Sequence, residues 1–145
     1  MSVDSPTTAL AERLEAALVD LWRQLLAQTD GELSRTSAAV LSMLRDGPRR
    51  ITELATAQAV AQPTMTVAVQ RLEARGLVTR ERATDDRRAT NVVITDAGRA
   101  LLAARHAART DALAERLQAL TPAQRDALEA ALPALTALLP QGPSS

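Results

Sequence analysis

A change of periodicity at Gly76 limits the possible folds of this chain more than any other feature. Before it, the apolar residues of segment 62–75 recur at helical spacing. After it, two short β-prone runs, 78–82 and 90–95, flank a polar loop and predict a β-hairpin with a charged tip. Gly76 itself suits the left-handed position that ends a helix in a Schellman cap, with Leu77 folding back. A helix is therefore expected to lead directly into a hairpin.

Further helical patterns precede and follow this segment. Apolar spacings of three and four residues, bounded by Gly and Pro, predict helices at about 8–28, 36–45, 52–59, 62–75, 96–120 and 122–139. Thr52, Thr95 and Thr121 are the expected N-caps, and Gln124 is placed to complete a capping box with Thr121. Pro133 is expected to kink or break the last helix.

The order of these elements predicts a winged helix-turn-helix. Two helices joined by a tight turn and followed by a charged hairpin can place the second helix in the major groove and the hairpin, or wing, in the minor groove. On segment 62–75, we expect one face to point into the core, formed by Met65, Ala68, Val69 and Leu72. Positions 62, 66 and 70 then share the opposite face. The expected fold class is mainly α with a small β-hairpin wing.

The distribution of charge favours nucleic acid as the partner, although the formal net charge of the 145 residues is zero. The net charge is −4 over residues 1–34, +6 over residues 35–109 and −2 over residues 110–145. A basic middle with acidic ends is typical of a DNA-binding core flanked by segments with another role.

The composition argues against most kinds of catalytic site. There is no cysteine, and His106 is the only histidine, which disfavours thiol chemistry and metal binding. Asp85 and Asp86 lie in an arginine-rich loop, the opposite of a setting that raises a carboxyl pKa for acid catalysis. We expect no enzymatic activity, no catalytic residue, no metal and no cofactor. Without a membrane-length apolar run or a secretory signal, the chain is expected to be cytoplasmic and to bind no membrane.

Several segments in order resemble the MarR (multiple antibiotic resistance regulator) family. They are QPTMT at 62–66, RLEARGLVTR at 71–80, DDRR at 85–88 and ITDAG at 94–98, with weaker matches at 33–34 and 40–41. The resemblance covers about residues 8–139.

The resemblance implies a domain plan and a set of site residues. It implies a single domain, 1–145, that forms a homodimer through helices 8–30 and 96–139 and carries a DNA-binding lobe at 34–95. The recognition helix lies at about 62–75 and the wing at about 78–95. Predicted DNA contacts on the recognition helix are Gln62, Pro63, Thr64, Thr66, Val67, Gln70 and Arg71. Predicted wing contacts are Asp86, which orients the tip, Arg87, and Arg88, which enters the minor groove. Predicted dimer contacts are Leu10, Leu14, Leu18, Leu21, Leu113, Leu117 and Leu135.

The expected function is a ligand-responsive repressor that binds a pseudo-palindromic operator in double-stranded DNA. Relatives commonly respond to a small phenolic or anionic aromatic effector, but the sequence names no pocket residues. Two alternatives stay open: a winged-helix module that binds another protein, and a constitutive DNA-binding protein without ligand control. Val67, where relatives often carry arginine, favours the protein-binding module, whereas Arg71 and Arg75 favour DNA.

For three further residues, the sequence predicts a local cost in stability or a packing role. Ala61 stands where the family usually has a Ser or Thr N-cap, a loss of about 1 kcal/mol. Ala59 stands at a turn where glycine is common, and a positive φ there costs roughly 1–2 kcal/mol. Trp22, the only aromatic residue, is expected to anchor an interface or the core rather than stack on a ligand.

Overall fold

The structure is a computed structural model that describes residues 5–29, 33–83 and 89–139. The chain divides into two compact units, residues 1–109 and 110–145, and helix α5 begins in the first and ends in the second. The elements in chain order are α1 (Pro6–Thr29), α2 (Arg35–Leu44), β1 (Arg49–Arg50), α3 (Ile51–Ala57), α4 (Gln62–Ala74), β2 (Val78–Arg82), β3 (Thr90–Ile94), α5 (Asp96–Gln118) and α6 (Pro122–Ala137).

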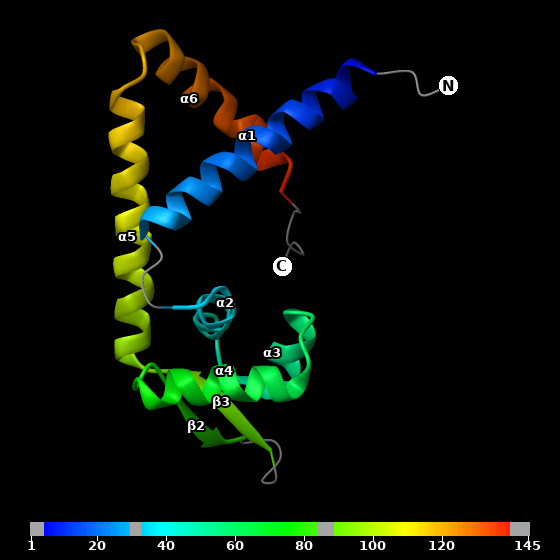
Figure 1. The fold of residues 1–145 in the computed structure, drawn as a ribbon, viewed down its shortest axis with the longest axis vertical. Helices are drawn as coiled ribbons and strands as arrows, with labels where there is room; N and C mark the ends of the chain where they lie inside the picture. The colour runs from blue at the N-terminus through cyan, green and yellow to red at the C-terminus, as the bar shows by residue number, and fades with distance from the viewer. Residues whose placement is uncertain (1–4, 30–32, 84–88, 140–145) are drawn as a thin grey trace. The chain divides into compact units, whose positions relative to one another are not determined.

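The core of the first unit lies between α2, α3, α4 and the sheet. Its largest fully buried side chains are Leu41, Leu44, Leu54, Met65, Leu72, Val40, Val69 and Val92. The predicted inward residues of α4, Ala68 included, are buried in this core. Since α3 and α4 are joined by a short turn and followed by the β2–β3 hairpin (Figure 1), the arrangement is a winged helix-turn-helix.

The sheet has three antiparallel strands in the order β1–β3–β2. The predicted hairpin is confirmed: in its register Val78 pairs with Ile94, and Arg82 lies opposite Thr90. The sequence did not predict β1, whose Arg49 pairs with Val92. Two consecutive arginines carry no β signal, and the strand exists because a distant strand pairs with it.

Strand β1 also explains why the prediction of Thr52 as an N-cap is wrong. Helix α3 begins at Ile51, and its N-cap is Arg50, which pairing with β3 holds in an extended conformation. The Oε2 atom of Glu53 accepts a hydrogen bond of 2.7 Å from the Arg50 backbone N–H. This carboxylate reaching back over the first turn is half of a capping box.

The second unit contains the end of α5 and all of α6. Thr121 caps α6 as predicted: its hydroxyl accepts from the Gln124 N–H at 3.3 Å, and Gln124 Oε1 accepts from the Thr121 N–H at 3.0 Å. The predicted break at Pro133 is wrong, because α6 runs through this residue to Ala137. Pro133 lies in the last turns of the helix. Proline there costs one backbone hydrogen bond, and the helix continues despite this loss.

Within the described residues, no helix is both long and apolar enough to span a membrane.

The turn between α3 and α4 strains one residue. Ala59 has φ of 51°, and the hydrogen bonds Val60 N to Ala55 O and Ala59 N to Thr56 O, both 3.1 Å, form a Schellman cap. An alanine therefore occupies the left-handed position that glycine adopts without steric cost.

Ala59→Gly is expected to raise the free energy of unfolding by about 0.5–1 kcal/mol. Relief of the left-handed strain contributes about 1–2 kcal/mol, offset by the greater unfolded-state entropy of glycine, about 0.4–1 kcal/mol. Urea denaturation measures the change. Ala104→Gly, at an exposed position inside α5, is the control and is expected to destabilise by about 1 kcal/mol. A lower midpoint for Ala59→Gly would contradict the strained turn.

Candidate nucleic-acid interface

Helix α4 begins at a weak cap. Its N-cap Ala61 has an extended backbone, with φ of −64° and ψ of 143°, and makes no side-chain cap hydrogen bond. Pro63 lies in the first turn, where the missing N–H removes no helical hydrogen bond. The start is therefore set by proline and by the preceding turn rather than by a capping hydroxyl.

The predicted inward face of α4 is confirmed, because Met65, Ala68, Val69 and Leu72 are all buried. The remaining predicted contact residues form what we term the recognition face: Gln62, Pro63, Thr64, Thr66, Val67, Gln70 and Arg71. All are exposed except Thr66, which is half-buried. The Thr66 hydroxyl donates to the Gln62 carbonyl at 2.9 Å. Thr66 therefore contributes less to this surface than the predicted alignment of 62, 66 and 70 implies.

The recognition face carries no carboxylate. The first acidic residue along α4 is Glu73, and its Oε2 lies 3.2 Å from Arg80 Nε on β2. This ion pair holds the only acidic side chain of α4 beside a cation of the wing. The exposed polar groups ahead of it are amides, hydroxyls and a guanidinium, which match the hydrogen-bonding groups of base edges and phosphates.

The end of α4 is tied to the start of α5. As predicted, Gly76 takes a positive φ of 70°, and Leu77 N donates to Leu72 O at 3.0 Å, which forms a Schellman cap. The Thr95 hydroxyl, the predicted cap of α5, donates to Gly76 O at 2.6 Å and accepts from Gly98 N at 3.1 Å. One hydroxyl thus joins the last turn of the recognition helix to the first turn of α5.

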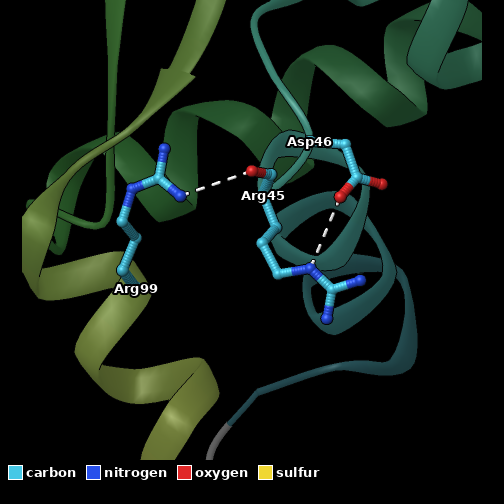
Figure 2. Close-up of polar contacts among 3 residues, drawn as sticks. All are labelled: Arg45, Asp46 and Arg99. Carbon is cyan, nitrogen blue, oxygen red and sulfur yellow. Dashed lines mark hydrogen bonds and ion pairs between the residues drawn. The ribbon is translucent and has the colours of Figure 1, made fainter.

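Helix α5 is also joined to the end of α2 (Figure 2). Arg99 Nη1 donates to the carbonyl of Arg45, the C-cap of α2, at 3.3 Å. Arg45 Nε in turn lies 3.5 Å from Asp46 Oδ1. A guanidinium at a helix C-terminus is favoured by the helix dipole. The sequence gives no sign of this contact, because the two arginines are 54 positions apart.

A hollow that the sequence did not predict adjoins the recognition face. This α2–α4 hollow has a volume of about 410 Å³ and is lined by Ser34, Thr36, Ser37, Thr64, Val67, Ala68 and Arg71. Ser34 is the N-cap of α2 and accepts from Ser37 N at 3.2 Å. The hollow therefore places the first turn of α2 beside the middle of the recognition face.

A second hollow, which we term the arginine hollow, lies between α1, α2 and α5. It has a volume of about 330 Å³ and is lined by Trp22, Leu26, Arg35, Ala38, Ala39, Ser42, Leu102, Arg105 and Arg109. The Arg109 guanidinium carbon lies 5.7 Å from the Trp22 ring centroid, within cation–π range. Trp22 is 53% exposed, so it is not the core anchor that the sequence allowed. In the sequence, the only indication of this hollow is the i, i+4 spacing of Arg105 and Arg109, which places both arginines on one face of a helix.

The wing contacts Asp86, Arg87 and Arg88 lie outside the described residues. The hairpin is described up to Ala83, whose N–H donates to the Ala89 carbonyl at 3.0 Å. Within the described ranges, no three acidic or histidine side chains cluster as a metal site would require.

The predicted dimer residues leave apolar surface uncovered in the single chain. On α1, Leu10 is 61% exposed, Leu18 and Leu21 are also exposed, and Leu14 is half-buried. In the second unit, the predicted dimer residues Leu113, Leu117 and Leu135 are half-buried, and the exposed leucines of α6 include Leu128 and Leu132. Each unit therefore presents a leucine-rich helical surface.

Comparisons with known proteins agree with this geometry. The MarR family model matches residues 32–89, which include α2, α3, α4 and β2. A probable transcriptional regulator from Pseudomonas aeruginosa is 30% identical, over 87% of this chain and 98% of that one, with a TM-score of 0.56. The chain belongs to the MarR family. It therefore has the winged helix-turn-helix fold of a family of transcriptional regulators.

Two further relatives of this MarR-family protein have solved structures. The transcriptional regulator Tm0710 from Thermotoga maritima is 25% identical over 88% of this chain and 94% of that one, with a TM-score of 0.77. BpsR from Bordetella bronchiseptica, whose DNA binding is regulated by 6-hydroxynicotinic acid, is 26% identical over 94% and 96%, with a TM-score of 0.54. Among curated proteins, none matches the chain.

Proposed function

We propose that this MarR-family protein is a repressor that binds a pseudo-palindromic operator as a homodimer and releases it when an aromatic carboxylate binds. The observation that carries the DNA-binding part is the recognition face. Its exposed amides, hydroxyls and guanidinium, without a carboxylate, suit the edges of base pairs in the major groove. Gln70 and Arg71 are the proposed base-reading residues, since glutamine pairs with adenine and arginine with guanine.

The uncovered leucines of α1, α5 and α6 support the proposed homodimer. Exposed apolar patches on a single chain mark interaction sites, and a second copy is the partner that two-fold symmetry of an operator requires. Residues 8–30 and 96–139 are the proposed dimerisation segments, and residues 34–95 the proposed DNA-binding lobe. Analytical ultracentrifugation tests this part, and a mass equal to one chain at micromolar concentration would contradict it.

DNA binding is tested by selecting duplexes from a random-sequence library with the purified protein. Affinity for the selected duplex is then measured over a series of salt concentrations. We expect a two-fold symmetric sequence, bound at least about a thousandfold more tightly than random duplex, with an affinity that falls linearly in log–log form as salt rises. Absence of binding to any duplex at low salt would favour the protein-binding module instead. Transcription in vitro from a promoter overlapping the operator then distinguishes repression from activation.

The arginine hollow is the proposed effector site. Its lining combines the guanidinium groups of three arginines and an indole with the apolar side chains of Leu26, Ala38, Ala39 and Leu102. A ligand with a flat apolar body and a carboxylate would match both kinds of group. A volume of about 330 Å³ lies in the range of small-molecule pockets. BpsR, 26% identical, is regulated by such an acid.

Arg109→Ala is expected to reduce the response to effector while leaving operator affinity unchanged. In the wild-type protein, 6-hydroxynicotinate or benzoate should weaken operator binding by at least about fivefold, the lower end of typical allosteric coupling. The variant should lose most of this change, because it removes a cation from the hollow. Arg13→Ala, an equal loss of charge on exposed α1, is the control, and 6-hydroxynicotinamide is the uncharged ligand control. If none of the acids changes the affinity of the wild-type protein for the operator, constitutive DNA binding is the better interpretation.

A further inference from the structure

Val67 is an apolar side chain in the middle of the polar recognition face. It is 44% exposed, and one helical turn away on either side stand Thr64 and Arg71. Within the described part of residues 34–95, Val67 is the only large apolar side chain with so much exposed surface. All other large apolar residues there are buried or half-buried.

Neither packing nor helix propensity accounts for a valine at this position. The core-facing side of α4 is already filled by Met65, Ala68, Val69 and Leu72, all buried. Turning Val67 inward would rotate those four side chains out of the core, because they share a face that Val67 does not. A β-branched residue is also a weaker helix former than the glutamine or alanine that exposed positions usually carry. What Val67 contributes must therefore lie outside the single chain.

The surroundings of Val67 indicate which kind of partner it contacts. The α2–α4 hollow sets Val67 among hydroxyl groups and the Arg71 guanidinium, with no carboxylate in its lining. A protein partner anchors on a contiguous apolar patch. Val67 is instead an isolated apolar group ringed by hydrogen-bonding and cationic groups. In B-DNA, the major-groove edge of a T·A pair presents one apolar group, the C5-methyl of thymine, among hydrogen-bond acceptors and a donor.

We infer that Val67 contacts the C5-methyl group of a thymine and so determines specificity for T·A at one position of each half-site. The inference rests on the proposed function, in which α4 enters the major groove. Thr64 and Arg71, on the same side of the helix, supply the polar contacts that hold Val67 against the base edge. Cytosine lacks the methyl group, so a C·G pair at this position leaves the valine without an apolar partner.

Deleting the thymine methyl group alone tests this contact. In the selected operator, each thymine position is replaced in turn by 2′-deoxyuridine, symmetrically in both half-sites, and the Kd is measured by fluorescence anisotropy at one salt concentration. For the wild-type protein, we expect one position at which the replacement weakens binding by about fourfold per methyl group removed. For Val67→Ala, the thymine and uracil duplexes at that position should bind within about twofold of each other.

Gln70→Ala is the matched control on the same face of α4. It should weaken binding at its own base while keeping the thymine-to-uracil ratio of the wild type. Val67→Ala replaces an exposed residue with a better helix former, so its thermal unfolding temperature should be no lower than that of the wild type. A uracil effect that persists in Val67→Ala would show that the methyl group acts through DNA shape, and would overturn the inference. Wild-type binding without any uracil effect would overturn it as well, whereas failure of the wild type to bind any duplex would remove the proposed function itself.

Discussion

Gly98→Ala is expected to lower the free energy of unfolding by about 2–3 kcal/mol. A Cβ atom at this position would lie in contact with the Leu77 carbonyl oxygen and 2.7 Å from Ile94 Cγ1. The first of these atoms is backbone, and the same carbonyl accepts a hydrogen bond from Thr95 N at 3.1 Å. Helix α5 must therefore move away from the end of α4 to admit one methyl group.

The sign of this change separates close packing from helix propensity. Alanine is a better helix former than glycine by about 1 kcal/mol, so propensity alone predicts that Gly98→Ala stabilises α5. Urea denaturation followed by circular dichroism decides between the two. The neighbouring exposed Ala97 is the control site, where Ala97→Gly should destabilise by at most about 1 kcal/mol. A Gly98→Ala variant as stable as the wild type would mean that α5 does not approach Leu77 closely.

The same close approach bears on DNA binding. Thr95 ties Gly76 to the first turn of α5, and Arg99 ties that turn to the end of α2. The direction of the recognition helix is consequently fixed against α5. In the proposed homodimer, a shift of α5 would change the separation of the two recognition helices, which must match the spacing of the half-sites. Leu102 and Arg105 of the arginine hollow lie on α5. A ligand that binds in this hollow and shifts α5 would therefore change the affinity of the proposed homodimer for its operator.

The parts of this site that the sequence predicts are those with local signals. Glycine at the end of α4 predicts its Schellman cap, because only a few residue types adopt positive φ there without strain. The period of Met65, Ala68, Val69 and Leu72 predicts which face is buried, and the remaining positions then follow by geometry. Even the strain at Ala59 can be anticipated, since the turn requires a glycine-like conformation that the residue resists.

The parts that the sequence misses depend on residues far apart in the chain. Strand β1 forms only because Arg49 meets Val92, and the mistaken cap at Thr52 follows from missing that strand. The hydrogen bond from Arg99 to Arg45 and both hollows likewise join segments that no local pattern connects. At Pro133, a local rule overstates the effect of proline because the helix has only one further turn to lose.

Arg88→Ala is expected to weaken operator binding by about tenfold to a hundredfold. The hydrogen bond from the Ala83 N–H to the Ala89 carbonyl joins the two ends of the described hairpin. Arg88 lies outside the described residues, and it is the resemblance to the MarR family that assigns it to the minor groove. A narrow minor groove has an enhanced negative potential that attracts arginine. The loss should therefore be larger for operators with A·T flanks than for operators with G·C flanks. Fluorescence anisotropy at fixed salt, on both kinds of duplex, measures it.

A charge-matched control separates this contact from general electrostatics. Arg13→Ala removes the same charge from exposed α1, outside the proposed DNA-binding lobe, and should change operator affinity by less than about twofold because salt screens distant charges. Unchanged affinity in Arg88→Ala would remove the wing from the interface and leave specificity to α4 alone. A loss independent of the flanking sequence would instead make Arg88 a phosphate contact, since phosphates are the same in every sequence. The wing would then position the protein on the duplex without reading it.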